Sequence, residues 1–176
     1  MKIIEEPLPG VKVFHSKRYY DNRGYFYELY NKNVFQKLGV TDTFVQDSFS
    51  HSHRGVLRGL HYTRVSPQAQ LLSVLHGEIF DVVVDIRRTS VTFGKWYGVR
   101  LGGAGPEHIY MPPGFAHGFC VLSDFTNLHY KATQVYDPKD NFGIIWNDPT
   151  LAIAWPVDRP TISERDRSFP CFELLS

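Results

Sequence analysis

Two arginines and a histidine fall together in a short glycine-rich segment, residues 54–62, which has the character of a β-strand. Arginine rarely packs in such a strand without an anion or a carboxylate beside it, and an imidazole can act as a base near neutral pH. Strict alternation would put Arg58 and His61 on opposite faces, so both reach one pocket only if the strand is irregular near Gly59. An edge strand with exposed arginines is the alternative that the pattern leaves open.

Further groups suited to proton transfer lie later in the chain. Tyr130, in an apolar strand pattern, could present its phenol as a proton donor or could simply pack in the core. Asp81 and Asp85 project from one face of the strand predicted over residues 78–86, where they are either solvated or line a polar interior. Asp166 lies among charged neighbours, a pattern that is also typical of a solvated tail.

The spacing of the histidines raises the question of a metal centre. His51 and His53 form an H-x-H pair, and residues 112–117 have the form P-x-G-x-x-H, ending at His117. Both patterns are similar to motifs of the cupins, whose metal ligands are three histidines and one glutamate, but no Glu follows soon after His53. The sequence therefore predicts no Fe or Mn site, leaves His51 and His53 as exposed loop residues, and favours a cupin-type double-stranded jelly roll.

Short strands separated by turns must position these side chains. Strands are expected over residues 11–15, 25–30, 43–50, 55–62, 71–75, 78–86, 95–101, 117–122 and 125–133. This spacing predicts an all-β sandwich or barrel with a few short helices. A helix is expected over 31–38, with Asn31 as its N-cap, and a short one near 163–167 in an otherwise irregular tail. Because linkers and repeats are missing from the pattern, a single domain over residues 1–176 is predicted.

Composition narrows the classes of function. Nineteen Lys and Arg against 18 Asp and Glu give a formal net charge of +1, which favours neither nucleic acid nor an anionic membrane as a partner. Cys120 and Cys171 are too few for a disulfide framework or a Cys-rich zinc site. The N-terminal residues lack a signal-peptide pattern, and no apolar run is long enough to span a membrane. A cytoplasmic protein is predicted.

Taken together, these stretches resemble one known family, the dTDP-4-dehydrorhamnose 3,5-epimerases. The matching stretches run in order over nearly the whole chain, at residues 21–26, 44–48, 54–62, 77–87, 90–96, 112–119, 130–133, 146–149 and 163–166. The resemblance implies a jelly-roll barrel, a dTDP-4-keto-6-deoxyhexose substrate, and epimerisation without metal or other cofactor. It also implies a homodimer, and the aromatic strand around Phe26 is expected to join the partner's sheet rather than stay exposed.

The resemblance implies a role for each matching residue. His61 would be the base that removes a proton next to the C4 ketone, Asp166 its dyad partner, and Tyr130 the acid that returns a proton on the other face. The implied substrate-binding positions, some of them contributed by a partner chain, are Arg23, Phe26, Glu28, Gln46, Ser48, Arg58, Gln70, His117, Tyr136 and Arg165. Among these, Tyr136 resembles the aromatic that stacks on thymine, whereas Arg58 and His117 resemble contacts to the sugar or diphosphate.

The sequence departs from the family pattern most clearly at Gln70, where a Lys is usual. That Lys is implicated in holding the C4 oxygen as negative charge develops, and a glutamine amide supplies only a dipole there. Ser48 also replaces an Asn, and a Glu expected near Asn141 is missing. These changes predict weak or partial epimerisation, so inversion at C3 only or C5 only stays open. A non-catalytic nucleotide-sugar-binding cupin and a metal-dependent cupin oxygenase are the alternatives from other classes.

Overall fold

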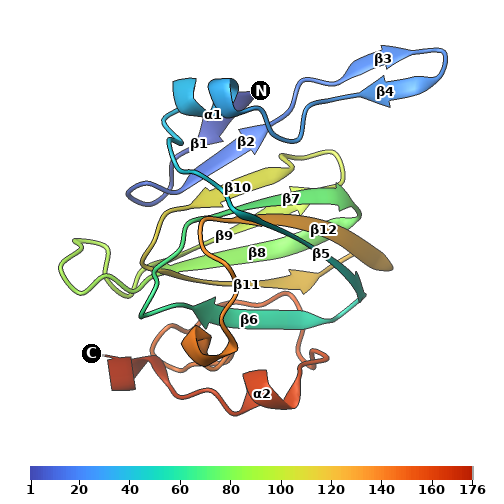
Figure 1. Ribbon diagram of the computed structural model, residues 1–176. Coiled ribbons are helices and arrows are strands. Elements are labelled where there is room, and N and C mark those ends of the chain that lie inside the picture. The colour runs from blue at the N-terminus through green and yellow to red at the C-terminus, as the bar shows by residue number, and fades with distance from the viewer. Residues whose placement is uncertain (176) are drawn as a thin grey trace.

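Two antiparallel sheets packed face to face form the body of the computed structural model, which describes residues 1–175 (Figure 1). Within these residues the first sheet has the order β1 (Lys2–Glu5), β2 (Lys12–His15), β10 (His108–Met111), β7 (Gln70–His76), β12 (Phe125–Ala132) and β5 (Gln46–His53). The second has the order β13 (Phe142–Gly143), β6 (Leu57–Tyr62), β11 (Phe115–Val121), β8 (Glu78–Asp85) and β9 (Trp96–Gly102). The prediction of an all-β jelly roll is confirmed.

The core lies between the two sheets. Val13, Leu72 and Leu128 from the first sheet meet Ile79 and Val83 from the second, and all five are almost completely buried. Each such side chain contributes about 1.5–3 kcal/mol when it is removed from water, so this layer holds the sheets together.

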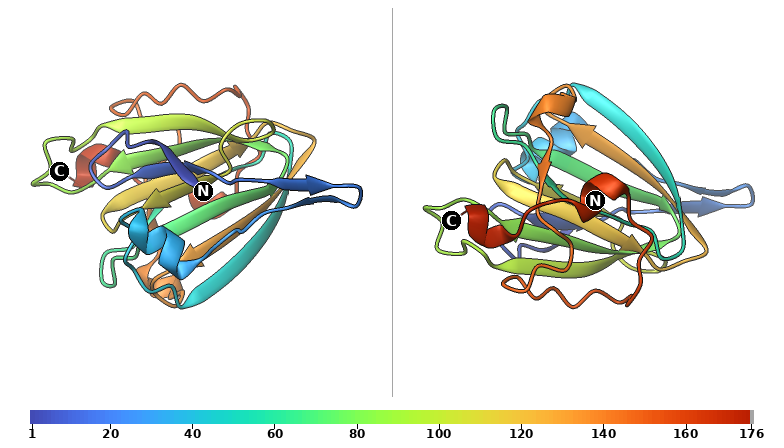
Figure 2. Two further views of the ribbon diagram at one scale, coloured as in Figure 1. Left: turned by 90° about the horizontal axis from the view of Figure 1, so that it is seen from above. Right: turned by 90° about the horizontal axis from the view of Figure 1, so that it is seen from below.

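Strand β8 is buried on both faces, because the second sheet is covered on its outer side as well. Val82 and Val84 point away from the central core and pack against Ile144, Leu151 and Phe172 of the C-terminal segment. That segment runs across the outer face of the sheet and carries the helix α2 (Glu164–Arg167) and the 3-10 turn η2 (Phe172–Leu175) (Figure 2). It thereby brings residues late in the sequence next to β6, which α2 contacts.

A short helix, α1 (Lys32–Lys37), covers the outer side of the first sheet. The side chain of Asn31 accepts hydrogen bonds from the backbone N–H groups of Asn33 and Val34, which confirms Asn31 as the N-cap. Phe35 is fully buried, with its ring centroid 5.2 Å from that of Phe14. The helix therefore packs against the sheet through Phe35.

Several features differ from the sequence-based expectations, and the short strands β1, β3 (Tyr19–Asp21) and β13 were not expected. Strand β10 was not expected, because its four residues are all buried and show no alternation that could be recognised in so short a run. The strand expected over residues 25–30 is only three residues long, β4 (Gly24–Phe26), which pairs with β3 (Tyr19–Asp21). His51 and His53 lie in β5 and not in a loop, because pairing with β12 extends that strand as far as His53.

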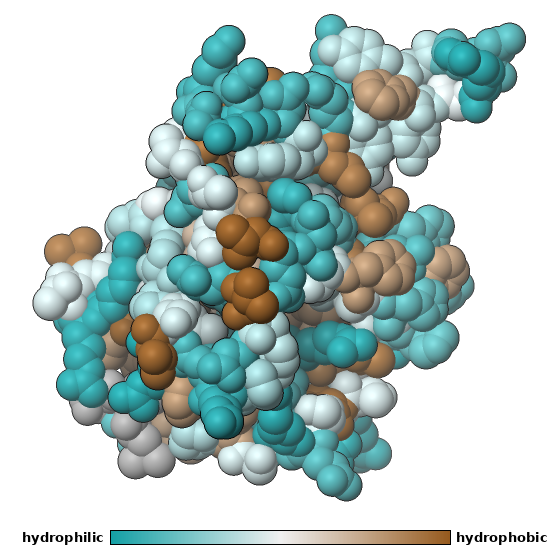
Figure 3. Space-filling view, viewed as in Figure 1, coloured by the Kyte–Doolittle hydropathy of each residue, from teal (hydrophilic) through white to brown (hydrophobic). Residues whose placement is uncertain are grey.

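The β3–β4 hairpin projects away from the two sheets (Figures 1 and 2). Its large side chains are mostly exposed, from 55% for Tyr25 to 70% for Tyr20, and Phe26 is 67% exposed. In the space-filling view the arm stands clear of the body, on which apolar and polar side chains are intermingled (Figure 3). No helix among residues 1–175 is long and apolar enough to cross a membrane.

Candidate active site

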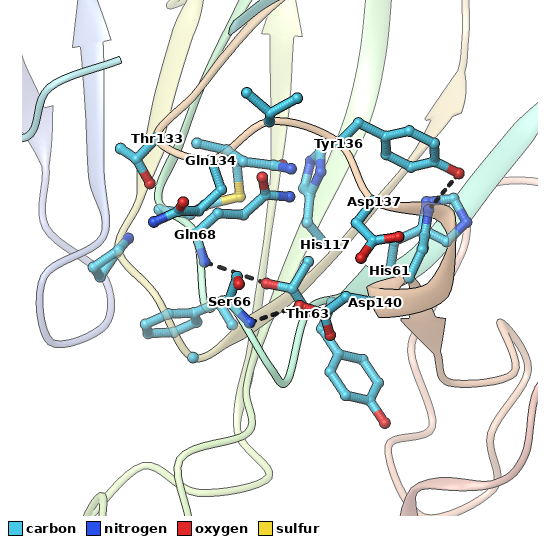
Figure 4. A pocket seen from close by; sticks show the side chains of 18 of the residues that line it. His61, Thr63, Ser66, Gln68, His117, Thr133, Gln134, Tyr136, Asp137 and Asp140 are labelled. Atoms are coloured by element: carbon cyan, nitrogen blue, oxygen red, sulfur yellow. Dashed lines mark hydrogen bonds between the residues drawn. The ribbon is translucent and has the colours of Figure 1, made fainter. Parts of the chain in front are cut away.

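A cavity of about 460 Å³ opens beside the strands β6, β7 and β11. Its wall combines residues of those strands with two loops, residues 63–68 and 133–141 (Figure 4). The predicted site residues His61, Gln70, His117 and Tyr136 all line it. The rest of the lining is largely polar or aromatic, so the cavity can take a polar ligand with a planar group.

An irregularity in β6 places Arg58 and His61 on the same face, as a shared pocket requires. His61 lies opposite His117 in β11, and Arg58 lies opposite Phe119, so three steps along β6 face two steps along β11. This is the register of a β-bulge. Alternation is thereby broken at Gly59. Arg58 does not line the cavity; its Nε donates to the Ser52 hydroxyl at 3.1 Å.

Glycine is required at the bulge because β6 and β11 approach very closely there. A Cβ on Gly59 would lie 2.5 Å from the Cα of Gly118 and 2.7 Å from the carbonyl oxygen of His117. Gly59 also has φ +123°, a conformation that side-chain-bearing residues rarely adopt. The pair of glycines therefore fixes the distance between the two strands that carry His61 and His117.

His61 and Asp166, which are 105 residues apart in sequence, form a hydrogen-bonded pair. His61 Nε2 lies 3.0 Å from Asp166 Oδ1, and Asp166 Oδ2 accepts the backbone N–H of Gly59, also at 3.0 Å. Ser163 caps α2 by accepting the N–H of Asp166. Burial of Asp166 would raise the pKa of its carboxyl, but the bonds from His61 and Gly59 outweigh this and lower it. An ionised Asp166 holds Nε2 protonated in the neutral imidazole and leaves the Nδ1 lone pair available as a base.

His117 has a carboxylate of its own. Its Nε2 lies 2.7 Å from Oδ2 of Asp81, whose side chain is completely buried. The other oxygen, Asp81 Oδ1, is buried without a hydrogen-bond partner among the described residues. Of the two alternatives for Asp81 that the sequence left open, the structure shows the polar interior.

Tyr130 reaches into the barrel from β12 and packs against the core, with its hydroxyl 2.8 Å from that of Ser50. Burial raises the pKa of the Tyr130 phenol to about 12, with a further contribution from the charge of Asp81; the bond to Ser50 and the charge of Arg58 act in the opposite direction. The phenol therefore keeps its proton at neutral pH, as a proton donor must.

Tyr136 stands at the entrance of the cavity, 53% exposed, on the loop after β12. Its backbone N–H donates to the side-chain carbonyl of Gln46 at 2.7 Å, and the amide of Gln46 donates in turn to Ser48. Hydrogen bonds from Asn141 and Arg165 lower the pKa of the Tyr136 phenol. The ring is thus held in place while one face stays open for stacking.

Asp140 fixes the shape of the cavity, and sequence reasoning did not single it out. Its carboxylate accepts three backbone N–H groups of the opposite loop, from Arg64, Val65 and Ser66, at 2.7–2.9 Å. These bonds lower the pKa of the Asp140 carboxyl, because they stabilise its charged form against the effect of desolvation. Asp140 is in the 3-10 turn η1 (Pro138–Asp140), and the Asp-Pro pair at its start is the only sequence signal that points there.

Of the ten predicted substrate-binding residues, only Gln70, His117 and Tyr136 line the cavity. Gln46, Ser48, Arg58 and Arg165 lie outside its lining, and so do three residues near the N-terminal hairpin. Arg23 and Phe26 belong to the projecting hairpin, where Arg23 pairs with Asp21. Glu28 accepts a hydrogen bond from the side chain of Asn31 at the start of α1.

Metal-ligand geometry is lacking in the described part of the chain: no three His, Cys, Asp or Glu side chains converge as they would to hold an ion. His51 Nδ1 instead lies 2.7 Å from the side-chain oxygen of Asn127 on the outer edge of the sheet. His53 makes an edge-to-face contact with His51.

Comparison with known proteins decides the family. The sequence profile of the dTDP-4-dehydrorhamnose 3,5-epimerases matches residues 5–173. The dTDP-4-dehydrorhamnose 3,5-epimerase of Methanothermobacter thermautotrophicus is 47% identical over 96% of this chain and 92% of its own. This chain belongs to the dTDP-4-dehydrorhamnose 3,5-epimerase family.

Other members of the epimerase family extend the comparison. The crystal structure of dTDP-6-deoxy-D-glucose-3,5-epimerase from Legionella pneumophila, in complex with dTDP-4-keto-L-rhamnose, has a TM-score of 0.95 and 45% identity, and covers 99% of this chain and 94% of that one. A dTDP-4-dehydrorhamnose 3-epimerase of Streptomyces niveus is 38% identical over 95% of this chain and 82% of its own. The cupin-type fold expected from the sequence is the fold of this family.

Proposed function

We propose that this protein epimerises a dTDP-4-keto-6-deoxyhexose next to its C4 ketone, as a 3,5-epimerase. The observation that carries the proposal is the His61–Asp166 pair, 3.0 Å apart, with His61 on the wall of a polar cavity. The complex of the Legionella relative with dTDP-4-keto-L-rhamnose supports the class of substrate.

Proton transfer at a carbon beside the ketone needs no redox step. Nδ1 of His61 takes the proton from C3 or C5, the C–H electron pair forms a carbon–carbon double bond, and the carbonyl electrons move to O4. Tyr130 then gives its phenolic proton to the opposite face of the carbon as the ketone re-forms, which inverts the centre. Solvent takes the proton from His61 and restores that of Tyr130. The Asp166 carboxylate stabilises the imidazolium that His61 becomes.

The remaining predicted residues would bind the substrate. Tyr136 would stack on thymine, with its loop held by Gln46 and Ser48, while Arg58 and Arg165 carry positive charge suited to the diphosphate. Arg165 lies 3.7 Å from Asp166 and is about half exposed, so its guanidinium remains open to a ligand.

A homodimer would complete the site. Strand β5 is the edge of the six-stranded sheet, and its outward side chains, Phe49 among them at 62% exposure, lack a cover in the described chain. An exposed edge and a projecting aromatic hairpin are complementary, so exchanged hairpins would bring Arg23, Phe26 and Glu28 to the partner's cavity. We further propose that residues 1–176 act as one domain in the cytoplasm, where Cys120 and Cys171 stay reduced.

Incubation of dTDP-4-keto-6-deoxyglucose with the enzyme in D2O, followed by NMR at C3 and C5, tests the proposal. The wild type should exchange both protons and invert at least one centre. His61→Asn should abolish exchange at both carbons and still bind dTDP. Exchange at the wild-type rate in that variant would refute His61 as the base, and binding without exchange in the wild type would favour the non-catalytic cupin.

A single-centre epimerase is the second candidate, and Gln70 is the observation that favours it. Gln70 lines the cavity, and the family resemblance implies a Lys at this position. The Streptomyces niveus relative is named as a 3-epimerase, which shows that the family includes single-centre enzymes. Deuterium at only one of the two carbons in the same experiment would establish this alternative.

A further inference from the structure

The enolate formed beside C4 places negative charge on O4, and a site that stabilises it needs a positive group at that oxygen. Among the described residues that line the cavity there is no Lys or Arg, and Gln70 offers only an amide dipole. Arg58 is on the same face of β6 as His61, but it lies outside this lining and its Nε donates to the Ser52 hydroxyl. Two lining side chains can carry positive charge, His61 and His117. His61 must begin the reaction neutral if it is to act as the base, so His117 is the cation that the cavity wall can supply.

The two histidine–carboxylate pairs differ in the contacts that their carboxylates make. Asp166 accepts a hydrogen bond from the N–H of Gly59 as well as its bond with His61, so both of its oxygens have a partner. Asp81 is fully buried, accepts its hydrogen bond from His117, and leaves Oδ1 unpartnered within residues 1–175. A buried carboxylate is costly unless a positive partner offsets it, and His117 is the side chain that is hydrogen-bonded to Asp81.

The charged and titratable groups around this pair are Arg58, two tyrosines and His61. Arg58 from β6 acts on Tyr130 through its charge, and its Nε donates to the Ser52 hydroxyl at 3.1 Å, outside the cavity lining. Tyr130 from β12 and Tyr97 from β9 are the phenols that interact with Asp81, and burial raises the pKa of both, to about 12 for Tyr130. Both are therefore neutral at neutral pH. His61 from β6, the residue opposite, is held by its own carboxylate.

The position of His117 suits contact with O4. Residues directly opposite in adjacent antiparallel strands have Cβ atoms about 4.5–5.5 Å apart, so the side chains of His61 and His117 start from neighbouring positions and both line the cavity. C3 and C5 are both bonded to C4, and a group that holds O4 must therefore lie beside the base. Nε2 of His117 is occupied by Asp81, which leaves Nδ1 as the ring nitrogen for a ligand (Figure 4).

We propose that the imidazolium of His117, held by Asp81, donates a hydrogen bond from Nδ1 to O4 and stabilises the enolate in place of a lysine. The inference rests on the proposed epimerase function. His117 is then a catalytic residue and Asp81 a positioning residue, and no proton leaves His117 during the reaction. The family resemblance alone assigned His117 to the sugar or diphosphate, which is a binding role.

A double-mutant cycle between His117 and Gln70 separates the two roles. His117→Gln keeps an amide donor and removes the charge, so kcat for exchange in D2O should fall by about 10²–10³-fold. The KM and the affinity for dTDP should change by less than about threefold, because the charge acts in the transition state. Adding Gln70→Lys should restore at least about tenfold to His117→Gln but change the wild type by less than about threefold. As a control, His129→Gln removes a similar His–Asp pair on the outer surface and should keep the wild-type kcat.

A second readout follows the charge of His117 without turnover. In ¹⁵N-histidine NMR of the free enzyme at neutral pH, both ring nitrogens of His117 should be protonated, and Asp81→Asn should convert the ring to the neutral form. Any one of three results would overturn the proposal. The first is a neutral His117 in the wild type, and the second is a raised KM with an unchanged kcat in His117→Gln. The third is an equal gain in kcat from Gln70→Lys in the wild type and in His117→Gln. If the wild type shows no exchange, the proposed function fails and this role fails with it; exchange that His117→Gln leaves intact overturns this role alone.

Discussion

Replacement of Asp166 by Asn tests the dyad with little change in shape. The carboxylate accepts two hydrogen bonds of 3.0 Å, from His61 and from the backbone of Gly59, whereas the amide has a single oxygen to offer. If that oxygen stays on Gly59, the NH2 group faces His61 Nε2 and forces the tautomer that carries its proton on Nδ1. The lone pair needed for proton abstraction is then lost from the cavity side.

The size of the effect follows from these contacts. A hydrogen bond to a charged group contributes about 1.5–3 kcal/mol, which corresponds to about 10–150-fold in the stabilisation of the imidazolium. The wrong tautomer in a similar Asp-to-Asn change of a serine protease costs about 10⁴-fold. For Asp166→Asn we therefore expect kcat to fall by between about 10² and 10⁴. The KM should change little, because Asp166 is not among the residues that line the cavity.

The assay is exchange of substrate protons in D2O at saturating substrate, together with thermal unfolding of each variant. Asp148→Asn is the matched control: Asp148 is also buried in the C-terminal segment and accepts three backbone N–H groups, from Thr150, Leu151 and Phe172. It should lower the melting temperature and keep kcat. A folded Asp166→Asn enzyme whose kcat stays within about threefold of the wild type would refute the reasoning.

Three other predictions concern the acid, the bulge and acid stability. Tyr130→Phe should still permit proton removal but impair inversion, so deuterium enters mostly with retention; equal loss of exchange and inversion would indicate a positioning role. Gly59→Ala should destabilise the fold by at least about 2 kcal/mol in urea unfolding, since the new Cβ meets the backbone of Gly118, and unchanged stability would contradict the close contact. The buried carboxylate of Asp85 accepts bonds from Arg87 and other groups that hold its pKa below the usual 3.8 against the effect of burial. The stabilisation from ionised Asp85 is present above that value and is lost as pH falls through the folded-state pKa. Asp85→Asn should therefore lower the free energy of unfolding by about 1–3 kcal/mol near pH 7 and by progressively less in acid. A loss that does not depend on pH would contradict this.

The sequence predicted the alternating strands and the capped helix because their signals are local. In β8 the period-two pattern separates Val82 and Val84 from Asp81 and Val83, and both faces are buried as that pattern allows. Strand β10 was missed, because four buried residues between prolines carry no periodicity.

The residues of the candidate site could be predicted from the sequence only through the family resemblance. Periodicity could not tell whether Asp166 is solvated, because its burial depends on how the C-terminal segment packs across the second sheet. The bulge at Gly59 could be stated as a condition for bringing Arg58 and His61 together, but its register depends on pairing with β11. Asp140 acts through three backbone groups of a distant loop, an interaction that leaves no trace in residue types.

The part of the molecule that carries Asp166 contributes no strand to either sheet. Between Ile144 and Phe172 the described chain is held on the outer face by apolar contacts, by Asp148 and by the bond that Gly59 donates to Asp166. Thr161 adds a single backbone bridge, through bonds with Gly55 and Leu57. Segments of this kind open at a lower free energy than the sheets beneath them. Mild denaturant should therefore abolish activity while the barrel remains folded. Loss of activity would then measure the detachment of this one segment and not the unfolding of the protein.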